Sequence, residues 1–312
     1  MTELVFGDEV ARAKAEGRPL VAQGVPIVSH GMPSPDNLET ALAVAETGRG
    51  TGAVPASIAI LDGRVRVGLS RAELERLARA DDVLKLSRAD LAYGVVSGRP
   101  GATTVAATMI VARLAGIPVF ATGGIGGVHR GAETSFDISA DLTELARTDV
   151  VVVAAGAKAL LDLPKTLEYL ETLGVPVVCY RTDAFPAFWS RQSGLPAPIR
   201  LDSPSEIARF LAARADLGLA GGTLVANPVP EADEIPAADI AGHIEAAHRD
   251  AAAAGIAGKA VTPFLLDAIL KRTGGRSLVT NIALIRSNAR LAGEIAVALA
   301  GGASARPERR GG

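Results

Sequence analysis

Short apolar segments without a charged residue alternate along this chain with longer segments that have a helical pattern. The clearest apolar segment is Val150–Val153. Others of this kind are residues 117–121, 175–180 and 223–226. A strand that is apolar on both faces must be covered on both faces, which is typical of parallel sheets packed between helices. Residues 64–68 alternate instead and follow Asp62-Gly63, which predicts an antiparallel hairpin. The pattern predicts an α/β protein with a mixed, mostly parallel sheet.

The chain of 312 residues shows neither an internal repeat nor a low-complexity linker. Its last third is mostly helical in pattern, over residues 237–254, 262–273 and 281–300. We therefore predict one catalytic domain over residues 1–301, followed by a disordered tail over 302–312.

The balance of charge excludes some partners. The formal net charge is −2, and no long run of like charge occurs, so attraction to nucleic acid or to a membrane surface is not expected. The N-terminal segment does not have the pattern of a signal peptide, and no stretch of about 18 apolar residues is present. These features predict a cytoplasmic protein.

Lysine is rare, with Lys14, Lys85, Lys158, Lys165, Lys259 and Lys271 the only six among 32 basic residues. Lys158 lies just past the end of the apolar segment at 150–153, at the sheet edge where ligands bind in α/β proteins. Its apolar neighbours disfavour the ammonium, which makes it a candidate nucleophile towards a carbonyl. The alternative is an ordinary lysine at a helix start. Lys85, also between apolar residues, is a candidate phosphate ligand or a strand lysine whose amine reaches solvent.

A glycine-rich loop, residues 121–133, follows the predicted strand at 117–121. It contains five glycines together with Thr122, His129 and Arg130. Glycines allow backbone amides to approach a phosphate, and basic side chains complete the charge match. The spacing does not match the dinucleotide-binding fingerprint. The alternative is a long loop without a ligand.

Two carboxylates four residues apart, Asp137 and Asp141, lie beside Ser135 and Ser139. One carboxylate could bind a hard cation and the other a sugar hydroxyl. The alternative is helix capping by Ser139 or Asp141.

Together these segments resemble pseudouridine-5′-phosphate glycosidases. The matching stretches run in order from about residue 19 to 300, which is almost the whole chain. They are Ser29–Pro33, Gly52–Ile60, Lys85–Arg88, Gly101–Ala106, Phe120–Leu145, Ala155–Lys158, Leu167–Thr172, Ala226–Glu231, Thr262–Leu266 and Thr280–Ile282.

The resemblance implies a three-layer α/β/α fold, a homotrimer and a divalent cation, usually Mn²⁺. It implies that Lys158 forms an imine with C1′ of an opened ribose 5-phosphate, and that Asp137 is the metal ligand. Lys158, Asp141 and Lys85 are the predicted catalytic residues. The predicted substrate-binding residues are Lys85, Thr104, Val105, Thr122, His129, Ser139, Ala140, Asp141 and Asn281, the last facing the base.

One departure from the family pattern concerns the entry strand, where the resemblance implies a glutamate that donates a proton to the uracil. The aligned position is Gly24, within Gln23-Gly24-Val25-Pro26, and carries no side chain. We therefore expect a larger aglycone pocket and a C-glycosynthase that joins ribose 5-phosphate to an aromatic, polyketide-like acceptor in secondary metabolism. The alternatives are a pseudouridine-5′-phosphate glycosidase that uses another acid, such as Glu39 or Glu133, and a non-catalytic sugar-phosphate binding protein.

Overall fold

The structure is a computed structural model that describes residues 3–25 and 36–304. Its eleven described strands form one sheet in the order β1-β4-β3-β2-β7-β8-β11-β9-β10, with β6 pairing to β3 and β5 to β6. The strands are β1 Leu4–Phe6, β2 Leu20–Gly24, β3 Val54–Leu61, β4 Arg64–Val67, β5 Leu84–Leu86, β6 Gly101–Thr103, β7 Val119–Ala121, β8 Val151–Ala154, β9 Val177–Tyr180, β10 Ile199–Leu201 and β11 Thr223–Ala226.

Strands β2, β7, β8, β11, β9 and β10 are parallel neighbours, whereas β3 pairs antiparallel with β4 and with β6. The mixed, mostly parallel sheet and the hairpin at Asp62-Gly63 are therefore confirmed. Because the central strands are parallel, their carboxyl ends and the loops that follow them meet at one edge of the sheet.

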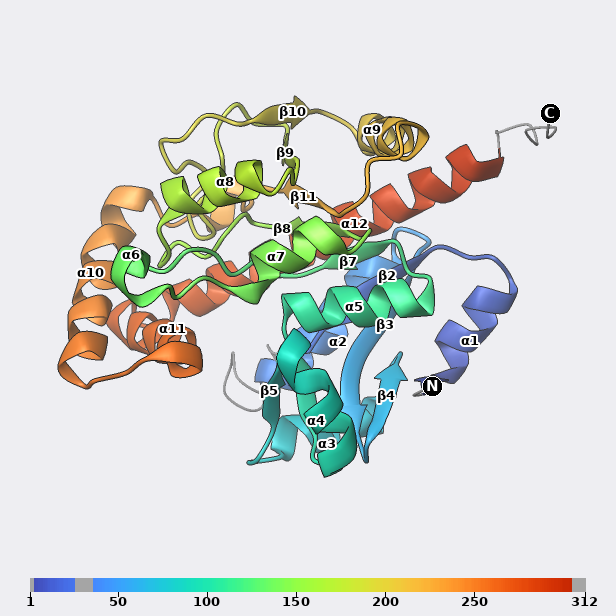
Figure 1. Ribbon diagram of the computed structural model, residues 1–312, viewed down its shortest axis with the longest axis horizontal. Helices are drawn as coiled ribbons and strands as arrows, with labels where there is room; N and C mark the ends of the chain where they lie inside the picture. Colours follow the sequence, from blue (N-terminus) through green and yellow to red (C-terminus); the bar gives the residue numbers. More distant parts are fainter. Residues whose placement is uncertain (1–2, 26–35, 305–312) are drawn as a thin grey trace.

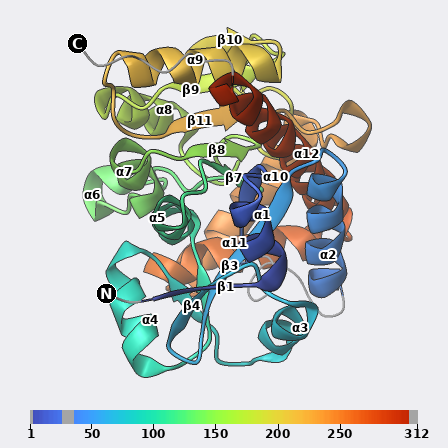
Figure 2. The same ribbon diagram turned by 90° about the vertical axis from the view of Figure 1, so that its right-hand side faces the viewer.

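Helices cover both faces of this sheet, as Figures 1 and 2 show. The helices are α1 Asp8–Ala15, α2 Asp36–Arg49, α3 Arg71–Arg79, α4 Leu91–Ser97, α5 Val105–Ala115, α6 Ala132–Ser135, α7 Ala140–Arg147, α8 Leu163–Thr172, α9 Pro204–Asp216, α10 Ala237–Ala253, α11 Val261–Arg272 and α12 Arg276–Ser304. In Figure 2, α5 and α7 lie on one side of β7 and β8, and α2 and α12 lie on the other.

Strand β8 explains why its sequence is apolar throughout. Successive side chains of a strand point to opposite faces. Val152 and Ala154 belong to the core beneath α5, α7 and α8, while Val151 and Val153 belong to the core beneath α9 and α12. The expected three-layer α/β/α arrangement is confirmed.

A local signal places the start of α3: Ser70 and Glu73 form a capping box, because each side chain accepts the other's backbone N–H. Strand β2 ends at Gly24. The matching stretch Ser29–Pro33 lies outside the described residues, as does most of the predicted tail.

In the described part of the chain, every helix is too short or too polar to cross a bilayer.

Candidate active site

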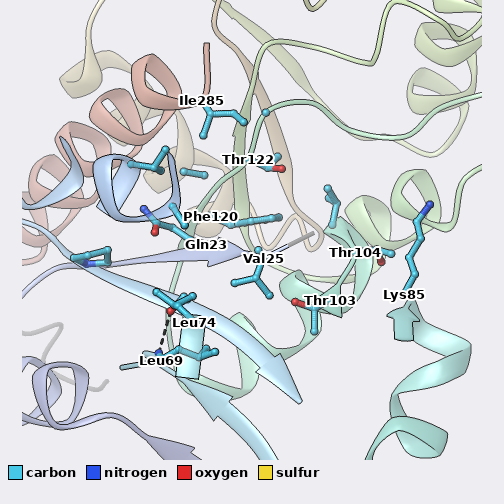
Figure 3. Close-up of a pocket in the computed structure, with 18 of the residues that line it drawn as sticks. Gln23, Val25, Leu69, Leu74, Lys85, Thr103, Thr104, Phe120, Thr122 and Ile285 are labelled. Carbon is cyan, nitrogen blue, oxygen red and sulfur yellow. Dashed lines mark hydrogen bonds between the residues drawn. The ribbon is translucent and has the colours of Figure 1, made fainter. Parts of the chain in front are cut away.

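All eleven residues predicted for the site line one cavity of about 1140 Å³. The cavity lies at the carboxyl ends of β2, β7 and β8, with Gln23 and Gly24 in its wall. Figure 3 shows Lys85 on one side of it and Gln23, Phe120 and Ile285 on the other. The eleven are Lys85, Thr104, Val105, Thr122, His129, Asp137, Ser139, Ala140, Asp141, Lys158 and Asn281. The structure thus brings the eleven residues together around one cavity, while their place in an active site and their individual roles stay predictions.

Lys158 lies in the loop after β8, five residues before α8 begins, and not at a helix start. The loops that follow β7 and β8 run side by side, with Ile125 and Ala157 paired as a parallel bridge. The Lys158 N–H donates to the Ile125 carbonyl (3.1 Å), and the amine Nζ donates to the Gly124 carbonyl (3.1 Å). Backbone contacts therefore hold the amine at the sheet edge.

Burial lowers the pKa of the Lys158 ammonium below its ordinary value of 10.5, an effect that the Asp141 carboxylate opposes. The residue as a whole keeps some exposed surface because it borders the cavity. Enough protein surrounds its amine for desolvation to dominate. A lysine in this environment is a better nucleophile near neutral pH than a surface lysine.

Asp141 is held by two backbone donors from different elements. Its Oδ1 accepts from the Ala106 N–H (2.9 Å) and its Oδ2 from the Gly126 N–H (2.8 Å). Ser139 is the N-cap of α7, as predicted for the capping alternative, and accepts from the Asp141 N–H (3.3 Å). The capping and substrate interpretations of this segment are compatible, since Asp141 also lines the cavity.

The Lys85 side of the cavity suits an anion. The first turns of α5 and α7 both border it, through Thr104 and Val105 in one case and Ser139 and Ala140 in the other. Helix N-termini offer free backbone N–H groups to a phosphate. Burial lowers the pKa of the Lys85 ammonium, against the attraction of Asp141. This end of the cavity can therefore bind a phosphate group.

His129, in the glycine-rich loop, and Asp137, four residues after the end of that loop, both line the cavity. His129 Nδ1 is 3.9 Å from Asp137 Oδ2, and the His129 N–H donates to the Asp137 carbonyl (3.0 Å). No group of three or more His, Cys, Asp or Glu side chains gathers among the described residues. A single carboxylate beside an imidazole can bind a cation whose other ligands are water molecules or substrate oxygens, as is usual for Mg²⁺ and Mn²⁺. A closed structural zinc site does not fit.

An ion pair links the turn just after β5, the strand that carries Lys85, to α7, the helix that carries Asp141. Arg88, after β5, donates from Nε and Nη2 to both carboxylate oxygens of Glu144 on α7 (2.6 and 2.7 Å). The Glu144 side chain is only 1% exposed, and the Thr148 hydroxyl also donates to it. The pair therefore ties the turn after β5 to α7, next to the Lys85 side of the cavity.

Several cavity residues were not predicted. Phe188 and Lys259 line it, and Gln23 does so with a buried amide nitrogen for which residues 3–25 and 36–304 offer no hydrogen-bond partner. The rarity of lysine was a usable signal for Lys259. The proposed substitute acids are not in the cavity: Glu39 is exposed, and the exposed Glu133 pairs with Lys165.

Comparison with known proteins identifies the family. Residues 9–298 match the model of the family described as Indigoidine synthase A like protein. The chain belongs to this family. A relative from Methylobacterium nodulans is 63% identical over 98% of this chain and 90% of its own length, and one from Jannaschia sp. is 63% identical over 95% and 98%. Both are named pseudouridine-5′-phosphate glycosidase. The predicted family and an enzyme acting on a carbon–carbon glycosidic bond are confirmed.

Solved structures agree on the fold. The prealnumycin C-glycosynthase AlnA, in complex with ribulose 5-phosphate, superposes with a TM-score of 0.90 at 39% identity, covering 98% of this chain and all of its own. An indigoidine synthase A-like protein from Thermotoga maritima gives 0.87 at 37% identity, covering 95% and 96%.

The expectation of a C-glycosynthase with an aromatic acceptor was wrong. Relatives at about 60% identity carry the glycosidase name, whereas the C-glycosynthase is only 39% identical. The expectation depended on the single position Gly24, and similarity over nearly the full length outweighs it. The findings favour the alternative of a pseudouridine-5′-phosphate glycosidase.

Proposed function

We propose that this protein cleaves pseudouridine 5′-phosphate reversibly into uracil and ribose 5-phosphate, with Lys158 as the nucleophile. The observation that carries the reaction type is the amine of Lys158, buried at the sheet edge with a lowered pKa and open to the cavity. The names of the close relatives support the choice of substrate. The Lys85 end of the cavity, with its two helix N-termini, suits the 5′-phosphate.

The covalent steps balance as follows. The neutral amine attacks C1′, and a carbon–nitrogen double bond replaces the bonds from C1′ to the ring oxygen and to C5 of uracil. The two protons lost by the amine end on the ring oxygen and on C5. Water then hydrolyses the imine, returning the amine and releasing the aldehyde form of ribose 5-phosphate. Splitting one difficult step into two easier ones is the advantage of a covalent intermediate.

Asp141 is the proposed proton carrier between the amine and C5. Its carboxylate lines the same cavity as Lys158 and Lys85, and its attraction opposes the lowering of the pKa of both lysines. Its oxygens already accept one backbone hydrogen bond each, but a carboxylate has about four acceptor sites in total. Position 24 carries no acid, and Glu39 and Glu133 are outside the cavity. Asp141→Asn is therefore expected to lower turnover by about 10²-fold or more.

We propose Mn²⁺ as the divalent cation, held by Asp137 with His129 beside it. When bound, such a cation supplies positive charge that polarises substrate oxygens. Chelator treatment is expected to lower activity, and added Mn²⁺ to restore it. Full activity after exhaustive chelation would contradict this assignment. The homotrimer and the cytoplasmic location stay predictions, the first of which sedimentation can test.

The direct test is incubation of the protein with pseudouridine 5′-phosphate and Mn²⁺, followed by chromatography for uracil and ribose 5-phosphate. The reverse reaction starts from those two products. Lys158→Met is expected to abolish both directions, while Lys165→Met is the matched control, because Lys165 is exposed and paired with Glu133. Absence of released uracil under all these conditions would contradict the proposal.

A further inference from the structure

The only tryptophan of the chain contacts the cavity indirectly. Trp189 is fully buried in the irregular segment between β9 and β10, and its indole Nε1–H donates to Oδ1 of Asn281 (2.7 Å). Asn281 comes from α12 and lines the cavity. Ile285, one helical turn further on, lies on the same face of α12, and Figure 3 shows it at the cavity beside Thr122.

The tryptophan cannot easily move away. The ring of Phe188 packs edge-on against it, with centroids 5.0 Å apart. Phe188 has a left-handed backbone (φ 60°), and its N–H donates to the Ala155 carbonyl (3.0 Å). The next residue in the chain is also anchored, because the Ser190 hydroxyl donates to the Ile235 carbonyl (2.6 Å). The indole is therefore a fixed donor.

A fixed donor decides which way the amide of Asn281 is turned. An indole N–H only donates, so the amide oxygen must face it, because the opposite orientation would bring two donors together. The oxygen of Asn281 is occupied by Trp189, and its NH₂ group remains for the cavity. This part of the cavity consequently offers a donor and favours a ligand with an acceptor there.

We propose that Trp189 is a positioning residue that holds the Asn281 amide so that it donates to a carbonyl oxygen of the departing base. The pair selects a base with a carbonyl at that position and rejects one with an amino group. This inference depends on the proposed function, because it concerns the base-binding part of the same cavity.

The test compares three substrates: pseudouridine 5′-phosphate and the two analogues in which an amino group replaces the carbonyl at C2 or at C4. The wild type is expected to disfavour one analogue by about tenfold or more in kcat/KM, since two facing donors leave buried groups unpaired. Trp189→Phe keeps the packing but frees the amide, so this ratio should fall towards one. Asn281→Asp keeps an acceptor for the indole and turns an acceptor to the base, so the preference should reverse.

A purely structural role of Trp189 gives a different outcome. In that case Trp189→Phe lowers kcat/KM for all three substrates by the same factor, and the ratio stays at the wild-type value. That result, or an unchanged preference in Asn281→Asp, would overturn the inference. If Trp189→Phe does not fold, Asn281→Asp alone decides between the outcomes.

The hydrogen bond can also be observed without catalysis. Because the chain has one tryptophan, its ¹H–¹⁵N spectrum contains one indole signal. Asn281→Leu is expected to shift that signal and speed its exchange with solvent, and an unchanged signal would overturn the inference. If the wild type cleaves none of the substrates, the proposed function fails. The preference for a carbonyl over an amino group can then still be tested by titrating the indole signal with uracil, cytosine and isocytosine. Equal affinity for the three bases would then contradict it.

Discussion

Removal of the Arg88 guanidinium is expected to destabilise the protein strongly, although half of that side chain is exposed. Its partner Glu144 is 1% exposed and would be left as a buried carboxylate with only the Thr148 hydroxyl. Breaking a fully buried pair from one side costs about 3–5 kcal/mol. Because Arg88 is 50% exposed, water can replace part of the lost contact, and we expect Arg88→Met to lower the unfolding free energy by about 2–3 kcal/mol.

Equilibrium unfolding in urea measures this loss as a lower midpoint at an unchanged slope. The double variant Arg88→Met with Glu144→Leu should recover to within about 1 kcal/mol of the wild type, because no charge is left buried. Arg71→Met is the control, since Arg71 is 72% exposed and its partner Glu75 on α3 keeps 32% of its side chain exposed, far more than Glu144, so this pair should contribute less than about 0.5 kcal/mol. If Arg88→Met costs no more than Arg71→Met, or if the double variant is the least stable, the reasoning about the buried carboxylate is refuted.

Three further predictions concern the cavity. Because burial lowers the pKa of Lys158, kcat/KM should rise with pH and level off below pH 10.5, and a rate that stays flat well into acid would contradict this kinetic prediction. The same burial penalises the protonated amine in the folded state. Lys158→Met should therefore be more stable than the wild type below pH 10.5, and the difference should vanish above that pH. Gln23→Met should raise the unfolding free energy by about 1 kcal/mol in thermal or urea unfolding, since it removes a buried amide nitrogen that has no hydrogen-bond partner within the described part of the chain. A loss of stability would contradict this expectation. Gly126→Ala would press a methyl group against Oγ and Cβ of Ser139 and place it 2.9 Å from Asp141 Oδ2, so it should displace both side chains and lower kcat/KM by about 10²-fold. Gly242→Ala on α10, with open space around it, should leave the kinetics unchanged. Equal kinetics in the two variants would show that the close packing of Gly126 against Ser139 and Asp141 is not needed.

The sheet could be predicted where its strands have a pattern long enough to read. The β8 segment and the β3–β4 hairpin were both predicted, because apolar content and alternation follow directly from which faces are covered. Strands β1, β6 and β10 have only three residues each and were not predicted, whereas β7, equally short, lies within the longer apolar segment 117–121 that was predicted. Three residues contain too little periodicity, and pairing with neighbours distant in sequence determines their conformation.

The candidate site also has features that local sequence patterns predict and one contact that they do not. Lys158 could be found because lysine is rare and its neighbours are apolar, and the glycine-rich loop because its composition is unusual. The contact between Trp189 and Asn281 joins residues 92 apart, and no local pattern announces it. The error about the acceptor came from giving the missing side chain at Gly24 more weight than the rest of the chain. The cavity retains Lys158, Lys85 and Asp141 without a carboxylate at position 24.

Borohydride trapping tests the central claim most directly. The protein is incubated with ribose 5-phosphate and Mn²⁺, reduced with borohydride, digested and analysed by mass spectrometry. If Lys158 is the nucleophile, a stable sugar-phosphate adduct forms on the peptide that contains Lys158, present in Lys165→Met and absent in Lys158→Met. Release of uracil from pseudouridine 5′-phosphate with no adduct, or with an adduct on another lysine, would contradict Lys158 as the nucleophile.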